Sequence, residues 1–451
     1  MLKRKIYEKL LDWKHSSHKK GLCITGARQV GKSTIAREFG RNEYESVLEV
    51  NFIRTPEALQ DFTTRDPEQI LLAVSTRLNL PVIPGRTLLI LDEIQECPNA
   101  RTAVKFLVED GRVDVLETGS LLGVNIHAVA SYPVGFEELL PMYPMDFEEF
   151  LWAMNTRRET LEYLKSCCKN LTPVSDSIHR QFLELFYRYM IVGGMPEAVQ
   201  TYVFSGNISD ISSIQRRIMD LYRMEILKYA QDREKTRILD IFDSIPAQLN
   251  DKGNRFRLSK VRKSARMERF ENSFLWLKEA GVALTCYNVS EVRIPFLLNE
   301  SRSLFRLFLC DTGLLTSCYS SEVQRELLDG NLQINYGSIM ENMIAQALTA
   351  KETPLYYYDN KRTELDFVAQ FGSKVHVLEI KSGNSYRNHP SLSRVLEDVN
   401  YQIDQAVVLC KGNIEQKGKI LYLPLYMIPF YEADREERVI VDDKLSSLMG
   451  L

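Results

Sequence analysis

The residues from Gly26 to Ser33 have the types and the spacing needed to hold a phosphate group. They match the pattern GxxxxGK[ST] at every fixed position. Glycines let backbone N–H groups curl around an anion, and the N-terminus of a following helix faces the same anion. Lys32 would bridge the β- and γ-phosphates of a nucleotide, and the Ser33 hydroxyl would ligate Mg²⁺. The sequence thus predicts a site for ATP and Mg²⁺ whose nucleotide-binding residues are Gly26, Ala27, Arg28, Gln29, Val30, Gly31, Lys32, Ser33 and Thr34.

The surroundings of this loop favour a phosphate site over an ordinary glycine-containing turn. An apolar run from Leu22 to Thr25 predicts a strand before it, and a helical pattern from Thr34 to Phe39 follows. A second apolar run, Leu88 to Leu91, ends in Asp92 and Glu93. A buried parallel strand would place Asp92 beside the loop, where it could hold Mg²⁺. Glu93 would then orient or deprotonate the attacking water.

A third segment is expected to bring a hydroxyl group to the same site. The apolar run from Val113 to Leu116 is followed by the sequence Glu-Thr-Gly-Ser. A polar residue at the tip of a neighbouring strand can contact the γ-phosphate or the attacking water. Thr118 and Ser120 are therefore catalytic candidates, together with Lys32 and Glu93. An ordinary exit from strand to turn is the alternative.

The composition is that of a soluble globular chain with several domains. Its 451 residues exceed one ordinary domain, and a content of 45% hydrophobic and 26% charged residues excludes wholesale disorder. A formal charge of −3 excludes a polycation, so any nucleic-acid surface must be a local patch. The 8 cysteines form no CxxC pair, which suits a reducing cytosol. With neither a signal-peptide pattern nor a long apolar run, the expected location is the cytoplasm, without membrane contact.

Apolar runs alternate with helical patterns at residues 21–25, 46–52, 87–91 and 113–118. Strands separated by helices predict the α/β class, with a parallel sheet and crossover helices. The motifs GARQVGKST, LLILDEIQ, ETGSLLG, YPMDFEEFL and GGMPEAV resemble those of a prokaryotic AAA-type ATP-binding family. Members of that family carry a C-terminal domain of unknown function, whose motifs are similar to FLCDTGLL, GSIMEN, TELDFVA and LEIKSG in this chain. The resemblance implies a P-loop NTPase core of AAA-like fold up to about Asp146, followed by a helical lid.

We expect four units along the chain. Residues 1–146 would form the P-loop ATPase core, and residues 147–230, where the pattern becomes helical, the lid. Residues 231–320 would form a winged-helix-like module. Residues 335–435 would form a small α/β domain of nuclease-like type.

The third unit contains the most basic stretch of the sequence. This stretch, residues 255–269, leads into a helical pattern ended by Gly281, and two apolar segments at 282–287 and 294–298 could form a wing. The arrangement resembles a winged helix, which would present a basic helix to DNA phosphates. The alternatives are a solvated helix face beside ordinary packing, or a module for protein contacts.

The fourth unit carries acidic residues and a lysine with nuclease-like spacing. Glu341 lies in a helical pattern, Asp366 in a short strand pattern, and Glu379 and Lys381 two positions apart in the next. The set resembles the PD-(D/E)xK nuclease arrangement, in which Asp366 and Glu379 would hold Mg²⁺ and Lys381 would activate water. The alternatives are a nuclease-like module that does not cleave, or an ordinary strand whose charges face solvent.

The expected activity is that of an ATPase. ATP hydrolysis with Mg²⁺ would drive or switch the C-terminal modules, with DNA as a candidate partner. Two alternatives stay open: a metal-dependent nuclease gated by ATP, and a slow ATP switch that acts through protein contacts. The sequence identifies no arginine finger, and it leaves open whether the chain forms a homo-oligomer.

Overall fold

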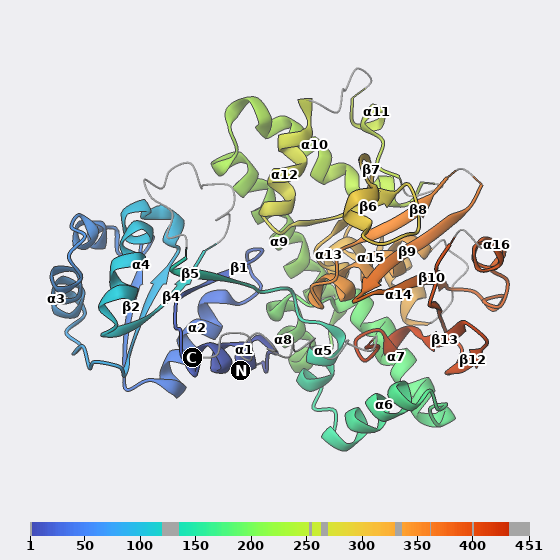
Figure 1. Cartoon of the computed structure of the whole chain (residues 1–451), viewed down its shortest axis with the longest axis horizontal. Helices are drawn as coiled ribbons and strands as arrows, with labels where there is room; N and C mark the ends of the chain where they lie inside the picture. Colours follow the sequence, from blue (N-terminus) through green and yellow to red (C-terminus); the bar gives the residue numbers. More distant parts are fainter. Residues whose placement is uncertain are drawn as a thin grey trace, which may run out of the picture.

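The structure, a computed structural model, describes residues 2–119, 135–251, 255–262, 269–329, 336–360, 362–398 and 401–432. Two lobes are visible in Figure 1, each built around one sheet. The first sheet lies in the N-terminal lobe, at the left. The second sheet and the helices from α5 onward form the other lobe. None of the described helices is long and apolar enough to cross a membrane.

The first sheet has five strands in the order β2-β3-β4-β1-β5, all parallel. Strand β3, inside this sheet, is buried at every position and apolar from Leu88 to Leu91, as a strand covered by helices on both faces must be. The predicted parallel α/β core is therefore confirmed. The strands are β1 (Gly21–Thr25), β2 (Ser46–Asn51), β3 (Thr87–Asp92), β4 (Val113–Thr118) and β5 (Glu137–Pro141). The helices of this part are α1 (Ile6–Lys14), α2 (Lys32–Glu43), η1 (Pro56–Phe62), α3 (Pro67–Leu78), η2 (Ile94–Glu96) and α4 (Pro98–Asp110).

A helical region follows the first sheet. It consists of α5 (Phe147–Ala153), α6 (Arg158–Asn170), α7 (Asp176–Val192), α8 (Pro196–Ser205) and α9 (Ile208–Tyr229). Gly193 and Gly194, the first two residues of the GGMPEAV motif, separate α7 from α8. A side chain at Gly194 would collide with the backbone of Met145, so this close approach requires a glycine.

The next segment contains an antiparallel ribbon, but its second strand begins after residues 294–298, the second of the two segments expected to form a wing. The ribbon consists of β6 (Ala283–Val289) and β7 (Glu300–Leu309). Residues 294–298, predicted as a strand, instead include most of the helical turn η5 (Phe296–Asn299). Pro295 supplies no backbone N–H for a ladder, and the two leucines that follow it are exposed. The helices before the ribbon are α10 (Asp232–Leu249), α11 (Leu258–Val261) and α12 (Glu271–Glu279).

The ribbon belongs to an eight-stranded sheet with the order β12-β13-β11-β10-β9-β8-β6-β7. Strand β6 pairs in parallel with β8, so residues on both sides of the predicted boundary at 320–335 share one sheet. The remaining strands are β8 (Tyr356–Asp359), β9 (Glu364–Phe371), β10 (Lys374–Lys381), β11 (Gln405–Cys410), β12 (Glu415–Lys417) and β13 (Ile420–Pro424). The remaining helices are α13 (Thr312–Thr316), α14 (Ser321–Leu328), α15 (Gly337–Ala350), α16 (Pro390–Glu397) and η6 (Leu425–Met427).

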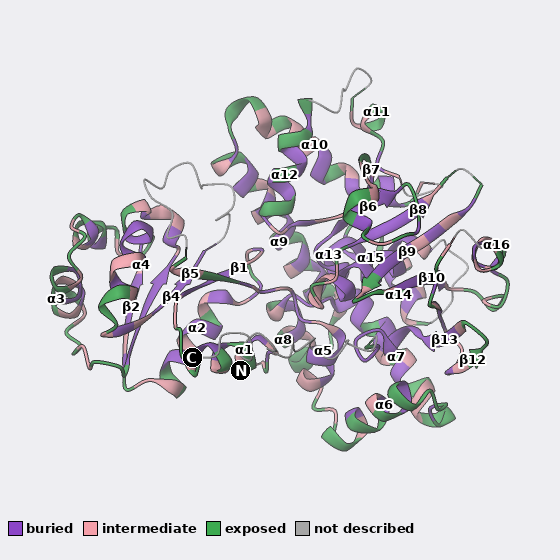
Figure 2. Ribbon diagram, in the orientation of Figure 1, coloured by how far each residue is buried: buried purple, intermediate pink, exposed green. Residues whose placement is uncertain are grey.

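Buried side chains run continuously from one lobe to the other. One apolar cluster includes α1, one face of the first sheet, the helices α5 to α9, α15 and one face of the second sheet. Figure 2 shows this burial along both sheets, while exposed residues lie on the outer helices. Such a shared core makes relative movement of the lobes depend on repacking of the helices between them.

Candidate nucleotide site and C-terminal carboxylate site

The loop after β1 has the backbone conformation that its glycines permit. Gly26 and Gly31 have φ values of 131° and 99°, and Gln29 also lies in the left-handed region at 68°. A Cβ at Gly26 would collide with the carbonyl oxygen of Met142. Helix α2 begins at Lys32, so its N-terminus faces the loop. Of the other predicted binding residues, Ala27 and Val30 are buried by packing, while Gln29 and Thr34 are exposed.

The Lys32 ammonium lies inside the loop. It donates hydrogen bonds to the carbonyl oxygens of Gly26 at 2.9 Å and Ala27 at 2.8 Å. Burial lowers the pKa of Lys32 to about 8, although the nearby carboxylate of Glu93 acts in the opposite direction. A desolvated cation at a helix N-terminus is a strong attractor for a phosphate oxygen.

Asp92 is the centre of the site. Its Oδ1 accepts hydrogen bonds from Ser33 Oγ at 2.6 Å and from the Thr118 hydroxyl. Its Oδ2 accepts from Asn51 Nδ2 at 2.6 Å and from Arg37 Nη2 at 3.2 Å. Asn51 and Thr118 are the direct cross-strand partners of Asp92 on β2 and β4, so three parallel strands end at this point.

The donor chemistry of Ser33 and Asp92 suits a hard cation such as Mg²⁺. Both offer oxygen atoms, which Mg²⁺ prefers, and the two side chains are in direct contact. Sequence reasoning found Ser33, Asp92 and Thr118 but missed Arg37 and Asn51. A signal was available for Asn51, because it ends the strand beside β3 at the same edge of the sheet.

Glu93 follows Asp92 in an unusual backbone conformation. Its φ of 56° and ψ of 48° are left-handed, which few non-glycine residues adopt. The Glu93 carboxylate accepts a hydrogen bond from Gln95 Nε2 at 2.5 Å. Its negative charge partly offsets the lowering of the Lys32 pKa by burial. Strained backbone of this kind concentrates at functional sites. The other candidate hydroxyl, that of Ser120, lies outside the described residues.

Arg4 joins the loop to the start of the helical region, a role that sequence reasoning missed. Its guanidinium donates to the carbonyl oxygens of Val30 at 2.8 Å and Tyr143 at 2.6 Å, and pairs with Glu149 at 3.1 Å. Arg4 and Glu149 are both buried. The ion pair fixes the loop against the segment that leads into α5.

ATP affinity is expected to fall as the pH rises above about 8, the pKa of Lys32 in the protein. Below that pH the side chain is an ammonium that attracts phosphate. Above it the free protein holds a neutral amine, so each further pH unit costs up to about tenfold in affinity. Calorimetric titration with ATP between roughly pH 7 and pH 9 measures the effect. An affinity that stays constant over this range would contradict the prediction.

The structure also brings together the residues predicted for a C-terminal site. Asp366 Oδ2 accepts from the Ile380 backbone N–H at 2.8 Å, so β9 places this carboxylate beside β10. Lys381 Nζ pairs with Glu379 Oε1 at 2.7 Å, while Glu379 Oε2 is buried without a hydrogen bond. Burial, and then the charge of Asp366, raise the pKa of Glu379 to about 8.

The predicted Glu341 faces an arginine that sequence reasoning missed. Arg306 on β7 is fully buried and pairs with Glu341 at 3.3 Å and with Glu364 at 2.5 Å. Its guanidinium also lies over the ring of Tyr357, 4.3 Å from the ring centre. An arginine inside the apolar run Leu-Phe-Arg-Leu-Phe-Leu was the available signal.

Only one place in the described part of the chain has three potential metal ligands within 4.8 Å of one another, at Cys23, Glu117 and Glu137. This cluster lies on β1, β4 and β5 of the first sheet. The Arg101 guanidinium already pairs with one of these ligands, since its Nη2 lies 2.9 Å from the Glu137 carboxylate. Among the described residues, the carboxylates of the C-terminal site do not form such a group of three.

Ion pairs partly neutralise the basic stretch at 255–269. Arg255 lies 3.7 Å from Asp359, Arg262 lies 2.6 Å from Asp240, and Lys260 pairs with Asp251. Residues 263–268 lie outside the described part of the chain. DNA contact through this stretch remains a prediction.

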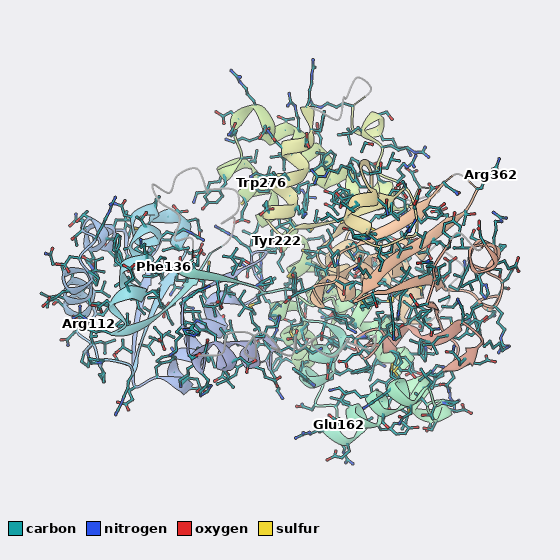
Figure 3. The ribbon with its side chains drawn as sticks, viewed as in Figure 1. Arg112, Phe136, Glu162, Tyr222, Trp276 and Arg362 are labelled. Carbon is teal, nitrogen blue, oxygen red and sulfur yellow. The ribbon has the colours of Figure 1, made fainter. Side chains whose placement is uncertain are left out.

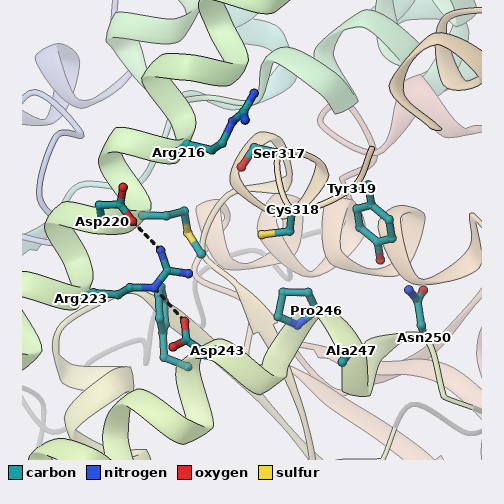
Figure 4. A pocket seen from close by; sticks show the side chains of 12 residues that line it. Arg216, Asp220, Arg223, Asp243, Pro246, Ala247, Asn250, Ser317, Cys318 and Tyr319 are labelled. Atoms are coloured by element: carbon teal, nitrogen blue, oxygen red, sulfur yellow. Dashed lines mark hydrogen bonds and ion pairs between the residues drawn. The ribbon is translucent and has the colours of Figure 1, made fainter. Parts of the chain in front are cut away.

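A cavity of about 650 Å³ lies between α9, α10 and residues 317–319. Figure 4 shows Arg223 in its wall, bridging Asp220 and Asp243, with Cys318 and Tyr319 opposite. It contains none of the residues predicted from the sequence to bind or react.

Family models match three successive parts of the chain. The AAA domain matches residues 18–151, and two domains of unknown function, DUF8612 and DUF4143, match residues 183–324 and 336–428. None of the curated proteins matches. Together with the five-stranded parallel sheet, the first match confirms the predicted AAA-type P-loop core. The nuclease-like character of the last part stays a prediction.

Three solved structures share distant similarity with the chain. A Walker-type ATPase of Pyrococcus abyssi is 15% identical, with a TM-score of 0.40 over 70% of this chain and 95% of that one. The Orc1 protein of Aeropyrum pernix, solved with DNA, is 14% identical, with a TM-score of 0.31 over 72% and 90%. Cdc6p of Pyrobaculum aerophilum is 11% identical, with a TM-score of 0.26 over 74% and 97%. At these scores the similarities give no information on activity.

Proposed function

We propose that the chain binds ATP with Mg²⁺ at the loop from Gly26 to Ser33 and hydrolyses it. The observation that carries this proposal is the convergence of Ser33, Thr118 and Asp92, whose oxygens meet next to the loop. An AAA-type core provides the matching fold. An acidic group beside a phosphate loop is the arrangement that phosphoryl transfer requires, because the reaction depends on positioning and on charge neutralisation.

Each residue has a distinct role in this proposal. Lys32 neutralises the transferred phosphate, and Ser33 and Asp92 would hold Mg²⁺, which supplies positive charge to the phosphates when bound. Glu93 accepts a proton from the attacking water or orients it. Thr118 positions Asp92, and Thr118 or Ser120 would contact the γ-phosphate or the attacking water.

Hydrolysis would switch the later parts of the chain through a buried hydrogen-bond centre at Asp311. Its Oδ2 accepts from the Gly194 N–H at 2.6 Å and from Gln346 Nε2 at 3.3 Å. The Gly194 carbonyl in turn accepts from the Met145 N–H at 2.7 Å. Residues 1–146, the lid at 147–230 and the parts at 231–320 and 335–435 would therefore move as coupled units.

The direct test is ATP turnover by the purified chain, with Mg²⁺ or with EDTA, and with or without DNA. We expect turnover that requires Mg²⁺ and is lost in Lys32→Ala. Stimulation by DNA would support a DNA partner, whereas its absence would favour output through protein contacts. Mg²⁺-independent turnover, or turnover that survives in Lys32→Ala, would contradict the proposal.

A second candidate function is metal-dependent cleavage of nucleic acid by the C-terminal site. It is favoured by the adjacency of Asp366, Glu379 and Lys381, and by the unpartnered, buried Glu379 Oε2. A cation bound there would stabilise the ionised form of Glu379. Incubation of DNA with the chain and Mg²⁺ or Mn²⁺ tests it, with Asp366→Asn as the control. Intact DNA after incubation with the wild type would remove this candidate.

A further inference from the structure

Helix α9 holds the outer side of the phosphate loop through three residues on one of its faces. The Tyr222 hydroxyl donates to the Arg28 carbonyl oxygen at 3.0 Å. The Arg28 guanidinium pairs with Glu225 and donates to the Tyr229 hydroxyl at 3.4 Å. Positions three and four residues apart share a helix face. Tyr222 lies at the junction of the two lobes in Figure 3, and it is buried together with Glu225.

The same end of α9 also contacts the segment that follows the acidic pair. The Tyr229 hydroxyl donates to Glu96 Oε1 at 2.7 Å, and Lys228 lies 3.6 Å from the same carboxylate. A second downstream element touches the loop at Gly281, between α12 and β6. A Cβ added at Gly281 would lie 3.0 Å from the Ala27 nitrogen.

The charges at this contact make it sensitive to a phosphate group in the loop. Glu225 is 6% exposed, so its carboxylate depends on Arg28 for compensation. Arg28 lies near enough to Lys32 for its charge to lower the pKa of that lysine. A triphosphate held by Lys32 would bring several negative charges within reach of the Arg28 guanidinium.

We infer that Glu225 is a positioning residue that competes with the terminal phosphate of a bound nucleotide for Arg28. Nucleotide occupancy would then be transmitted to α9 and to the lobe behind it. The inference rests on the proposed nucleotide site. It assigns Arg28 two alternative partners and gives α9 two alternative positions.

An adjacent side of α9 offers a place to observe such movement. Met219 and Arg223 of α9 line the cavity of Figure 4 together with Cys318. Cys318 is exposed, while the other seven cysteines are buried. A fluorescent maleimide on Cys318 would therefore report the position of α9 against residues 317–319.

Removal of the competing charge is expected to tighten nucleotide binding. Glu225→Gln keeps the side-chain shape but frees Arg28 for the phosphate. The affinity for a non-hydrolysable ATP analogue should rise about fivefold or more, the lower end of typical coupling energies. The affinity for ADP should rise less, because ADP lacks the terminal phosphate. Calorimetry gives both values, and the control is Glu234→Gln, the same change on neighbouring α10.

The outcomes separate this inference from the function on which it rests. Unchanged or weaker binding of the analogue by Glu225→Gln would overturn the competition, and so would a Cys318 label that does not respond to the analogue. Either result, combined with wild-type binding that depends on Lys32, would leave the nucleotide site intact. Absence of nucleotide binding by the wild type would remove both. Cys318→Ser provides the background for the labelling.

Discussion

Replacement of Glu93 by glutamine is expected to lower ATP turnover by about 100- to 10,000-fold, the contribution typical of a general base. Glutamine has the same size and can keep the contact with Gln95, but it cannot accept a proton from water. ATP affinity should change little, because the loop, Lys32 and Ser33 are untouched. Phosphate release under single-turnover conditions measures the loss, and calorimetry measures the binding.

Turnover and binding by Glu93→Gln and the wild type should be compared near pH 7. The charge of Glu93 raises the pKa of Lys32, so its removal lowers that pKa further from about 8. At higher pH the variant would lose binding as well as chemistry. The matched control is Glu109→Gln, an exposed residue on α4. Turnover by Glu93→Gln within tenfold of the wild type would exclude Glu93 as the base.

The candidate nucleotide site could be predicted from the sequence because its main residues lie in two local patterns. The loop from Gly26 to Ser33 is contiguous, and Asp92 and Glu93 come directly after a strand whose apolar residues are contiguous too. Parallel strands end at a common edge, so the pattern alone places Asp92 beside the loop. Thr118 follows from the same rule, since it ends the next strand of the sheet.

Residues that act through tertiary contacts could not be found in this way. Arg4 stands between two lysines at the chain start and reads as part of a solvated charge run, yet it is 6% exposed. Its burial depends on Glu149, which is 145 positions away in the sequence. Arg37 likewise lies within a helix with no local sign that it reaches Asp92.

The sequence also did not show which strands pair within one sheet. Strand β5 (Glu137–Pro141) begins with two glutamates and lies at the edge of its sheet, so it lacks the apolar run that marks the central strands. The ribbon of β6 and β7 has a local pattern, but only its pairing with β8 shows that it extends the C-terminal sheet. Such pairing joins residues about 70 positions apart, beyond the reach of periodicity.

Replacement of Arg306 by leucine is expected to destabilise the C-terminal sheet by about 3–5 kcal/mol, the usual cost of breaking a buried ion pair. The half-exposed Glu364 can be solvated by water after the change, but the Glu341 side chain is only 11% exposed. A buried carboxylate on α15 would then remain without the positive charge of Arg306. The variant would also lose the guanidinium over Tyr357.

Hydrogen exchange of the amides in β7 and β9 measures the loss of stability locally. A local measurement is needed because a chain of several units need not unfold in one step. Arg302→Leu is the matched control: it lies on the same strand, but its side chain is 79% exposed. The double variant Arg306→Leu/Glu341→Gln should regain part of the protection from hydrogen exchange, because it also removes the carboxylate charge that Arg306 neutralises. If Arg306→Leu costs no more than Arg302→Leu, the buried cluster does not stabilise the sheet.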